Sequence, residues 1–197
     1  MIVILDYGSG NLRSAERAFQ TSGEKVLVTS DYETALNAEG LVVPGVGAFG
    51  ACMSGLKKIR GEKLIRERSI KNLPVLGICV GMQILFQTGI EGGSHEGVGI
   101  LPGRVDKLRA KILPHMGWNT VSVSGSSNLF KGIENERFYF VHSYALIESD
   151  LKVKAKTDYQ GEFVSAIEVG AISATQFHPE KSGEAGIQLI SNWVKSL

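Results

Sequence analysis

The stretch PVLGICVGMQ, residues 74–83, places a cysteine where an apolar run gives way to apolar residues at helical spacing. The run predicts a buried strand, and the spacing, which continues to Phe86, predicts a helix, so Cys79 lies at the junction. Gly77 and Gly81 stand two positions on either side, as expected of a nucleophile elbow, whose strained backbone brings helix and strand close together. A helix N-terminus also favours the thiolate that attacks carbonyl carbon. We therefore predict that Cys79 is a nucleophile rather than a small buried residue that merely packs.

The chain before this stretch alternates short apolar runs with helical patterns. Such alternation is typical of a parallel sheet whose two faces are covered by helices. Strands are predicted at 2–5, 25–29 and 41–43, and helices over 12–19 and, with a break near Gly61, over 50–69.

The chain after it changes character. Residues 88–102 are rich in glycine and polar side chains and predict a surface loop, in which we assign no role to His95. Ser182 is the expected N-cap of a closing helix. We therefore predict an α/β fold over residues 1–197, in one domain, with a mixed, mostly parallel central sheet, helices on both faces and a small, mainly antiparallel β portion. The strands of this second half are expected at 103–107, 120–123, 137–141, 153–157, 163–169 and 171–175.

Composition excludes several classes of function. A net charge of +1, with 43% hydrophobic and 21% charged residues, indicates neither nucleic acid nor a membrane surface as a partner. The sequence opens on an apolar strand without a basic leader, so we expect a cytoplasmic protein, with Cys52 and Cys79 as reduced thiols and Cys52 as a packing residue. The turn Gly8-Ser9-Gly10 lacks the third glycine of a dinucleotide fingerprint, because position 13 is Arg13. No nucleotide, other cofactor or metal ion is expected.

Three loops are expected to share one crevice with the nucleophile. In an open α/β sheet the ligand crevice lies at the carboxyl ends of the strands, where residues 8–11, residues 44–47 and Cys79 all fall. Gly45, Val46 and Gly47 expose backbone N–H groups with little obstruction, and with the amide of Val80 they suit an oxyanion hole. The alternative for these glycines is a plain tight turn.

A cysteine nucleophile needs a base, and His178 is the best placed of the four histidines. It falls at the carboxyl end of an apolar strand, where Pro179 favours an extended conformation. The side chains of His178 and Glu180 then point the same way. A carboxylate on one ring nitrogen orients the imidazole, leaving the other nitrogen for Cys79. The alternative is a surface histidine and glutamate beside a proline turn.

These motifs together resemble the class I glutamine amidotransferases. The elbow GICVGMQ at 77–83 and the distant His178-Pro179-Glu180 are shared across that class. The remaining motifs resemble those of the glutaminase subunits of imidazole glycerol phosphate synthases, and the match runs nearly end to end. They are DYGSGN at 6–11, PGVGAF at 44–49, MGWN at 116–119, FYFVHSY at 138–144 and QFHPEKS at 176–182.

The resemblance implies a mechanism and a partner. It implies that Cys79, His178 and Glu180 release ammonia from glutamine through a glutamyl thioester. The substrate is then held by Gln83 and by the backbone of Gly47, His142 and Ser143, although the His142 side chain suits a structural contact better. The family's partner is a separate (β/α)8 barrel cyclase in a heterodimer, which uses the ammonia to make imidazole glycerol phosphate and aminoimidazole carboxamide ribotide. Positions that match its interface are Asn11, Trp118, Tyr139 and Lys181.

Two other functions stay open at this point. One is a glutaminase that feeds another acceptor, such as pyridoxal phosphate synthase or anthranilate synthase. The other is a non-catalytic partner-binding module that keeps the α/β fold, in which Cys79 only packs. The family resemblance also implies low activity without the partner, because the oxyanion loop must rearrange, which is a coupling between two sites.

Overall fold

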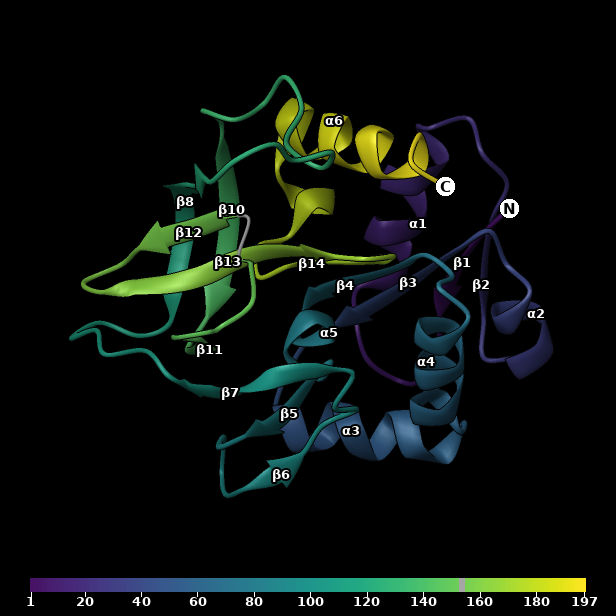
Figure 1. The fold of residues 1–197 in the computed structure, drawn as a ribbon, viewed down its shortest axis with the longest axis horizontal. Helices are drawn as coiled ribbons and strands as arrows, with labels where there is room; N and C mark the ends of the chain where they lie inside the picture. Colours follow the sequence, from purple (N-terminus) through teal and green to yellow (C-terminus); the bar gives the residue numbers. More distant parts are fainter. Residues whose placement is uncertain (153–154) are drawn as a thin grey trace.

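The computed structural model describes residues 1–152 and 155–197, and a twisted sheet runs through its centre (Figure 1). Within these residues the sheet has eight strands. The first five in spatial order are parallel, and the last three continue it in antiparallel pairing. In that order they are β2 (Val26–Thr29), β1 (Ile2–Leu5), β3 (Gly40–Gly45), β4 (Val75–Cys79), β14 (Ile172–Thr175), β13 (Glu162–Val169), β12 (Ala155–Asp158) and β9 (Ser122–Val123).

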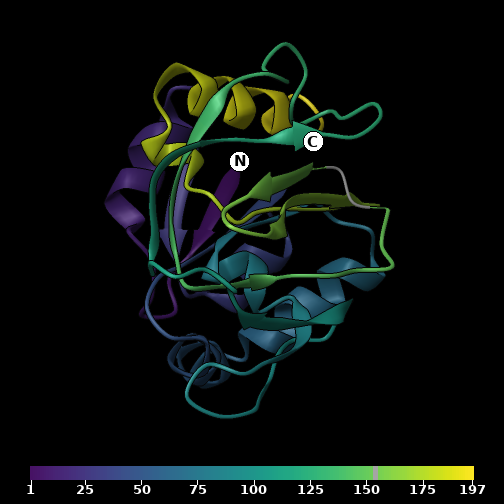
Figure 2. The same cartoon turned by 90° about the vertical axis from the view of Figure 1, so that its left-hand side faces the viewer.

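Helices cover both faces of the parallel part, as predicted. Figures 1 and 2 show α1 (Leu12–Gln20) and α6 (Gly183–Val194) on one face. The other face carries α3 (Phe49–Lys58), α4 (Gly61–Ile70) and the single turn α5 (Val80–Gln83). The short helix α2 (Tyr32–Leu36) packs on α4, and a 3₁₀ turn, η1 (Pro179–Lys181), leads from β14 into α6.

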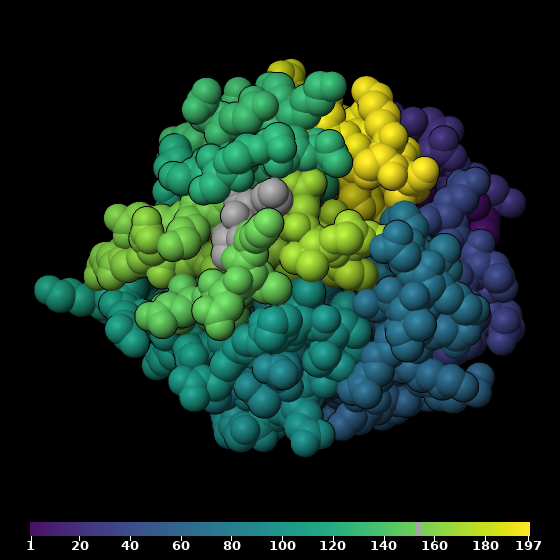
Figure 3. All heavy atoms as spheres, viewed as in Figure 1, coloured from purple at the N-terminus to yellow at the C-terminus, as the bar shows by residue number. Residues whose placement is uncertain are grey.

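Two smaller sheets complete the second half of the chain. β8 (His115–Thr120) and β10 (Arg137–His142) form an antiparallel ribbon. The other sheet is β11 (Tyr144–Leu146), β7 (Leu101–Lys107), β5 (Phe86–Gly89) and β6 (His95–Glu96), antiparallel except between β5 and β7. The predicted fold class is therefore confirmed. In Figure 3 the loop between β7 and β8 protrudes from the surface.

Several element boundaries differ from the prediction. The helix after Cys79 ends at Gln83 and not at Phe86, because Phe86 begins β5 and pairs with Leu101. The predicted loop over 88–102 therefore contains the end of β5 and all of β6. The sequence patterns also do not predict α2, β8 or β11. Of the predicted strand 153–157, residues 153 and 154 lie outside the described residues, and the remainder belongs to β12.

Cys52, expected to pack, is buried with a free thiol. In the described part of the chain no helix is both long and apolar enough to cross a membrane.

One charged side chain lies in the core that supports β3 and β4. Arg68, on α4, is fully buried and donates to backbone carbonyls only. Three of these carbonyls, at Ala35, Leu36 and Ala38, belong to the end of α2 and the segment that follows it, and their bonds to Arg68 are 2.9–3.0 Å long. Burial without a carboxylate lowers the pKa of Arg68 to about 10. The guanidinium, carried by α4, therefore links this helix to the end of α2 and to the residues just before β3 and β4.

We expect Arg68→Leu to lower the free energy of unfolding by about 3 kcal/mol, because several buried carbonyls lose their donor. Urea denaturation measures this change. Arg66, exposed on the same helix, supplies the control, since Arg66→Leu is expected to change stability by less than about 0.5 kcal/mol. Equal decreases in the free energy of unfolding for the two variants would contradict a stabilising role for the Arg68 hydrogen bonds.

Candidate active site

Cys79 ends β4 in a backbone conformation that few non-glycine residues adopt. Its φ is 56° and its ψ −111°, and α5 begins at the next residue. A Cβ on Gly81 would lie 1.8 Å from the carbonyl oxygen of Val43, and one on Gly77 2.8 Å from that of Gly81. The strained junction and the requirement for small neighbours both agree with the predicted elbow.

His178 follows β14, which is hydrogen-bonded directly to β4. Its backbone is extended, with φ −101° and ψ 96°, and its Nδ1 lies 2.7 Å from Glu180 Oε1. Glu180 reaches the ring from the η1 turn and not from an extended strand, although the predicted pairing is present. Both side chains are almost fully buried. The pair is therefore shielded from water and fixed in orientation.

Ser182 holds the predicted N-cap position of α6, but its hydroxyl does not cap the helix. Its Oγ donates to the carbonyl of His178 at 2.6 Å and accepts from the backbone N–H of Tyr139 at 3.0 Å. Its side chain makes no capping bond to α6. The serine instead anchors the backbone of His178 to β10.

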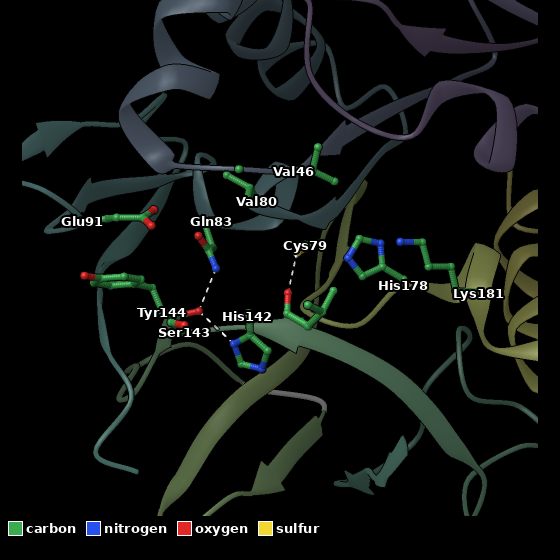
Figure 4. Close-up of a pocket in the computed structure, with 12 residues that line it drawn as sticks. Val46, Cys79, Val80, Gln83, Glu91, His142, Ser143, Tyr144, His178 and Lys181 are labelled. Carbon is green, nitrogen blue, oxygen red and sulfur yellow. Dashed lines mark hydrogen bonds between the residues drawn. The ribbon is translucent and has the colours of Figure 1, made fainter. Parts of the chain in front are cut away.

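The His178 ring faces Cys79 with its second nitrogen. Nε2 is buried and has no hydrogen-bond partner among the described residues, and Figure 4 shows the ring beside Cys79. Burial lowers the pKa of His178, but the interaction with the Cys79 sulfur and the hydrogen bond and charge of Glu180 outweigh it and raise that pKa to about 10. The imidazole is accordingly protonated at neutral pH.

Cys79 and His178 line a cavity of about 190 Å³. It lies where β3, β4 and the segment after β10 meet, at the carboxyl ends of the central strands, as expected. Gly45 is not in its lining and pairs with Cys79 inside the sheet. The lining residues are Val46, Gly47, Cys79, Val80, Gln83, Glu91, Val141, His142, Ser143, Tyr144, His178 and Lys181 (Figure 4).

The expected oxyanion loop is held by the loop after β1. The Val46 N–H donates to Ser9 Oγ at 3.1 Å, and that hydroxyl also lies 2.9 Å from the Val46 carbonyl oxygen. The Cys52 thiol reaches the same carbonyl at 3.3 Å. The two loops therefore meet, but residues 8–11 do not line the cavity as predicted, and the Val46 N–H is already bound to Ser9.

His142 contributes to the cavity mainly through its backbone. Its Nδ1 lies 2.9 Å from the Tyr144 carbonyl oxygen and its Nε2 3.0 Å from Nδ1 of His115. Burial lowers the pKa of His142 to about 3 and that of His115 to about 4. Both rings are neutral at physiological pH, so the His142 side chain makes the structural contact that the sequence favoured.

The four residues matched to a partner interface lie in different settings. Asn11 caps α1 by accepting from the Ser14 N–H at 3.3 Å. Trp118 is 49% exposed and packs edge-on against Tyr139, at 6.3 Å between ring centroids, so it is not a core residue. Lys181 lines the cavity beside the His178 ring (Figure 4).

Four residues of the site had no predicted role. Val141 lines the cavity, and its carbonyl accepts from the Cys79 thiol at 3.9 Å. Tyr144 and Gln176 stand in quoted motifs, but only the folded chain shows the carbonyl of Tyr144 accepting from Gln83 at 2.8 Å and Gln176 beside Cys79. Glu91 carried no signal, since it falls in the segment predicted as a surface loop. Its carboxylate accepts from the Phe49 N–H at 2.9 Å at the start of α3.

The arrangement suits acyl transfer through a thiol. A cysteine at a strained turn, an imidazolium facing it and a carboxylate behind the ring are the parts of a nucleophile, base and orienting group. No cluster of metal-binding side chains occurs among the residues that the structure describes.

Comparison with known proteins gives consistent results. Residues 3–197 match the family model described as glutamine amidotransferase class-I. The chain is 55% identical to the imidazole glycerol phosphate synthase subunit HisH of Mycobacterium bovis, over 100% of this chain and 98% of that protein. It is 53% identical to the HisH subunit of Streptomyces avermitilis, over 100% and 96%. A crystal structure of a glutamine amidotransferase superposes with a TM-score of 0.79 over the full length of both chains, at 16% identity.

Proposed function

The chain belongs to the class-I glutamine amidotransferase family, and from this membership we propose that it is the glutaminase subunit of an imidazole glycerol phosphate synthase in histidine biosynthesis. The observation that carries the proposal is full-length similarity, at 52–55% identity, to proteins of that name. The cavity around Cys79 supports the chemistry. An enzyme with two free thiols suits the reducing cytoplasm.

Substrate glutamine enters the cavity with its side-chain amide toward Cys79. Gln83 and the backbone of Gly47, His142 and Ser143 hold it. Glu91 is drawn on the other side of Cys79 from His178 in Figure 4. Its carboxylate has the charge that suits the α-ammonium group of an amino acid, so we assign that contact to Glu91.

The first half of the reaction forms a thioester. The Cys79 sulfur attacks the amide carbon, whose π electrons move to oxygen. His178 then gives its Nε2 proton to the departing nitrogen as the C–N bond breaks, which releases ammonia and leaves a glutamyl thioester on Cys79. Glu180 stabilises the imidazolium and fixes Nδ1 as its hydrogen-bond donor.

The second half returns the enzyme to its starting state. Neutral His178 takes a proton from water, whose oxygen attacks the thioester carbon. The C–S bond breaks, glutamate forms, and the thiolate–imidazolium pair is restored.

The oxyanion of both steps needs N–H donors near Val80 and Val46. Because the Val46 N–H donates to Ser9, we propose that this peptide group must turn before the hole is complete. Before this peptide group turns, the chain is a weak glutaminase. A change that starts outside the cavity turns the group and so completes the oxyanion hole.

A synthase must receive the ammonia, and the relatives are named as subunits of one. We propose that the partner is a (β/α)8 barrel cyclase in a heterodimer with this chain. Half-exposed Trp118, packed on Tyr139, suits an interface anchor. Asn11 and Lys181, whose elements α1 and η1 pack together, are assigned to the same interface.

Glutamate release measured with and without the cyclase and its ribonucleotide ligand tests this function. We expect slow hydrolysis by the chain alone and an increase of about 100-fold in the presence of both, which corresponds to strong coupling between two sites. A subunit of another glutamine-dependent synthase serves as the control. Activation by that control, or an unchanged rate with the cyclase, would contradict the assignment.

A further inference from the structure

Gln176 is completely buried and contacts the nucleophile directly. It lies between β14 and His178, and its backbone N–H donates to the carbonyl of Ser165 on β13 at 2.9 Å. Its carboxamide Nε2 is 3.7 Å from Cys79 Sγ, within hydrogen-bonding distance for sulfur. In the part of the chain that the structure describes, the titratable groups whose charges interact with Cys79 are His178, Cys52 and Tyr7. The Cys79 thiol also lies 3.9 Å from the carbonyl oxygen of Val141. None of the catalytic steps above uses Gln176.

The orientation of the Gln176 amide is fixed by Gln83. The Nε2 group of Gln83 donates one hydrogen to the carbonyl of Tyr144, at 2.8 Å, and the other to Gln176 Oε1, at 3.0 Å. Gln83 is the donor in both of these hydrogen bonds, so the atom of the Gln176 carboxamide that faces Gln83 must be an acceptor, its oxygen. Its own N–H group is thereby left facing Cys79.

A pair of neutral histidines supports the same carbonyl of Tyr144. Asn119 Nδ2 lies 3.2 Å from His115 Nε2, which must accept because the amide nitrogen only donates. His115 Nδ1 then donates to His142 Nε2, and His142 Nδ1 donates to Tyr144. Every bond in this series has a compatible donor and acceptor. The series runs from Asn119, on the β8 strand that carries Trp118, to the sulfur of Cys79.

We propose that Gln176 is a positioning residue of the nucleophile, which donates a hydrogen bond to the Cys79 thiolate from the protein interior. The series Asn119–His115–His142–Tyr144–Gln83 fixes its carboxamide in the donating orientation. Charge-assisted hydrogen bonds stabilise a thiolate in addition to the imidazolium of His178. The proposal rests on Cys79 being the nucleophile, but its test does not need turnover of glutamine.

Alkylation of Cys79 by iodoacetamide, followed against pH, measures thiolate formation. Mass spectrometry of the cysteine peptides distinguishes Cys79 from Cys52. We expect Gln176→Leu to move the midpoint of the Cys79 profile upward by about one pH unit, so that the alkylation rate below the midpoint falls about tenfold. An unchanged midpoint in the folded variant overturns the proposal.

Two further variants make the test decisive. Gln176→Glu keeps the acceptor for Gln83 but places a carboxylate oxygen next to the sulfur. The midpoint of the Cys79 alkylation profile is therefore expected to rise at least as far as in Gln176→Leu. If Gln176→Leu does not fold, an unchanged midpoint in Gln176→Glu overturns the proposal instead. Ser165→Ala is the control for packing, since Ser165 is equally buried and its Oγ has no hydrogen-bond partner among the described residues. A shift in Ser165→Ala as large as that in Gln176→Leu would also overturn the proposal.

Discussion

Cys79→Ser is expected to lower glutamine-dependent turnover of the assembled synthase by at least about 1,000-fold while leaving turnover on ammonium salts unchanged. A serine hydroxyl is ionised far less readily than a thiol, so the variant lacks the anionic nucleophile that pairs with the imidazolium of His178. On the proposed function, the ammonia-dependent reaction takes place in the partner subunit and needs no nucleophile in this chain. Product formation by the complex, with either nitrogen source, measures both activities.

The control for this substitution is the second thiol. Cys52 contacts Ser9 and Val46, and a serine hydroxyl keeps a donor for the Val46 carbonyl. We expect Cys52→Ser to retain at least about a tenth of the glutamine-dependent activity. Survival of both activities in Cys79→Ser would instead favour a non-catalytic partner-binding module.

Glu180→Gln is expected to reduce glutamine hydrolysis by about 100-fold or more without loss of fold. The carboxylate is buried and stabilises the charged ring at 2.7 Å. Its removal lowers the pKa of His178 from about 10 toward the ordinary value. Steady-state glutaminase kinetics of the activated complex measure the effect, and Glu184→Gln, at an exposed carboxylate on α6, is the control. An unchanged rate would remove Glu180 from the catalytic group.

The His178–Glu180 pair also predicts how the stability of the fold depends on pH. Because the folded-state pKa of His178 is raised to about 10, the protonated ring stabilises the fold fully below pH about 6.5, and this contribution is lost as pH rises toward about 10. In Glu180→Gln the folded-state pKa of His178 is lower, so the pH range over which the protonated ring stabilises the fold ends at a lower pH. Denaturant unfolding at about pH 6 and about pH 10 compares the two proteins, and the variant is expected to lose less stability between these values.

Local pattern was enough for the parts of the site that depend on neighbours in sequence. The glycines around Cys79 are needed for close packing, and this requirement is visible in residues 77–81 alone. The His178–Glu180 contact was also predicted from a spacing of two residues, although the η1 turn and not an extended strand brings the two side chains together. The central strands were predicted because continuous apolar runs identify buried parallel strands.

The rest depends on contacts between distant segments. The spacing after Cys79 suited a longer helix, but pairing of Phe86 with Leu101 converts the chain to strand. Glu91 reaches the cavity only because β5 and β6 fold beneath α3. That Ser9 binds the Val46 amide is a contact between two loops, and no property of either loop alone reveals it.

The position of β14 between β4 and β13 has a consequence for biosynthesis of the enzyme. Chains emerge from the ribosome N-terminus first, so β4 and Cys79 are made long before the strand that sits beside them. Until β14 arrives, β4 lacks one neighbour, and the thiol has neither His178 nor Gln176 beside it. A nascent chain that ends before β14 therefore has Cys79 without His178, Glu180 and Gln176 beside it. On the proposed mechanism, we expect such an incomplete chain not to hydrolyse glutamine.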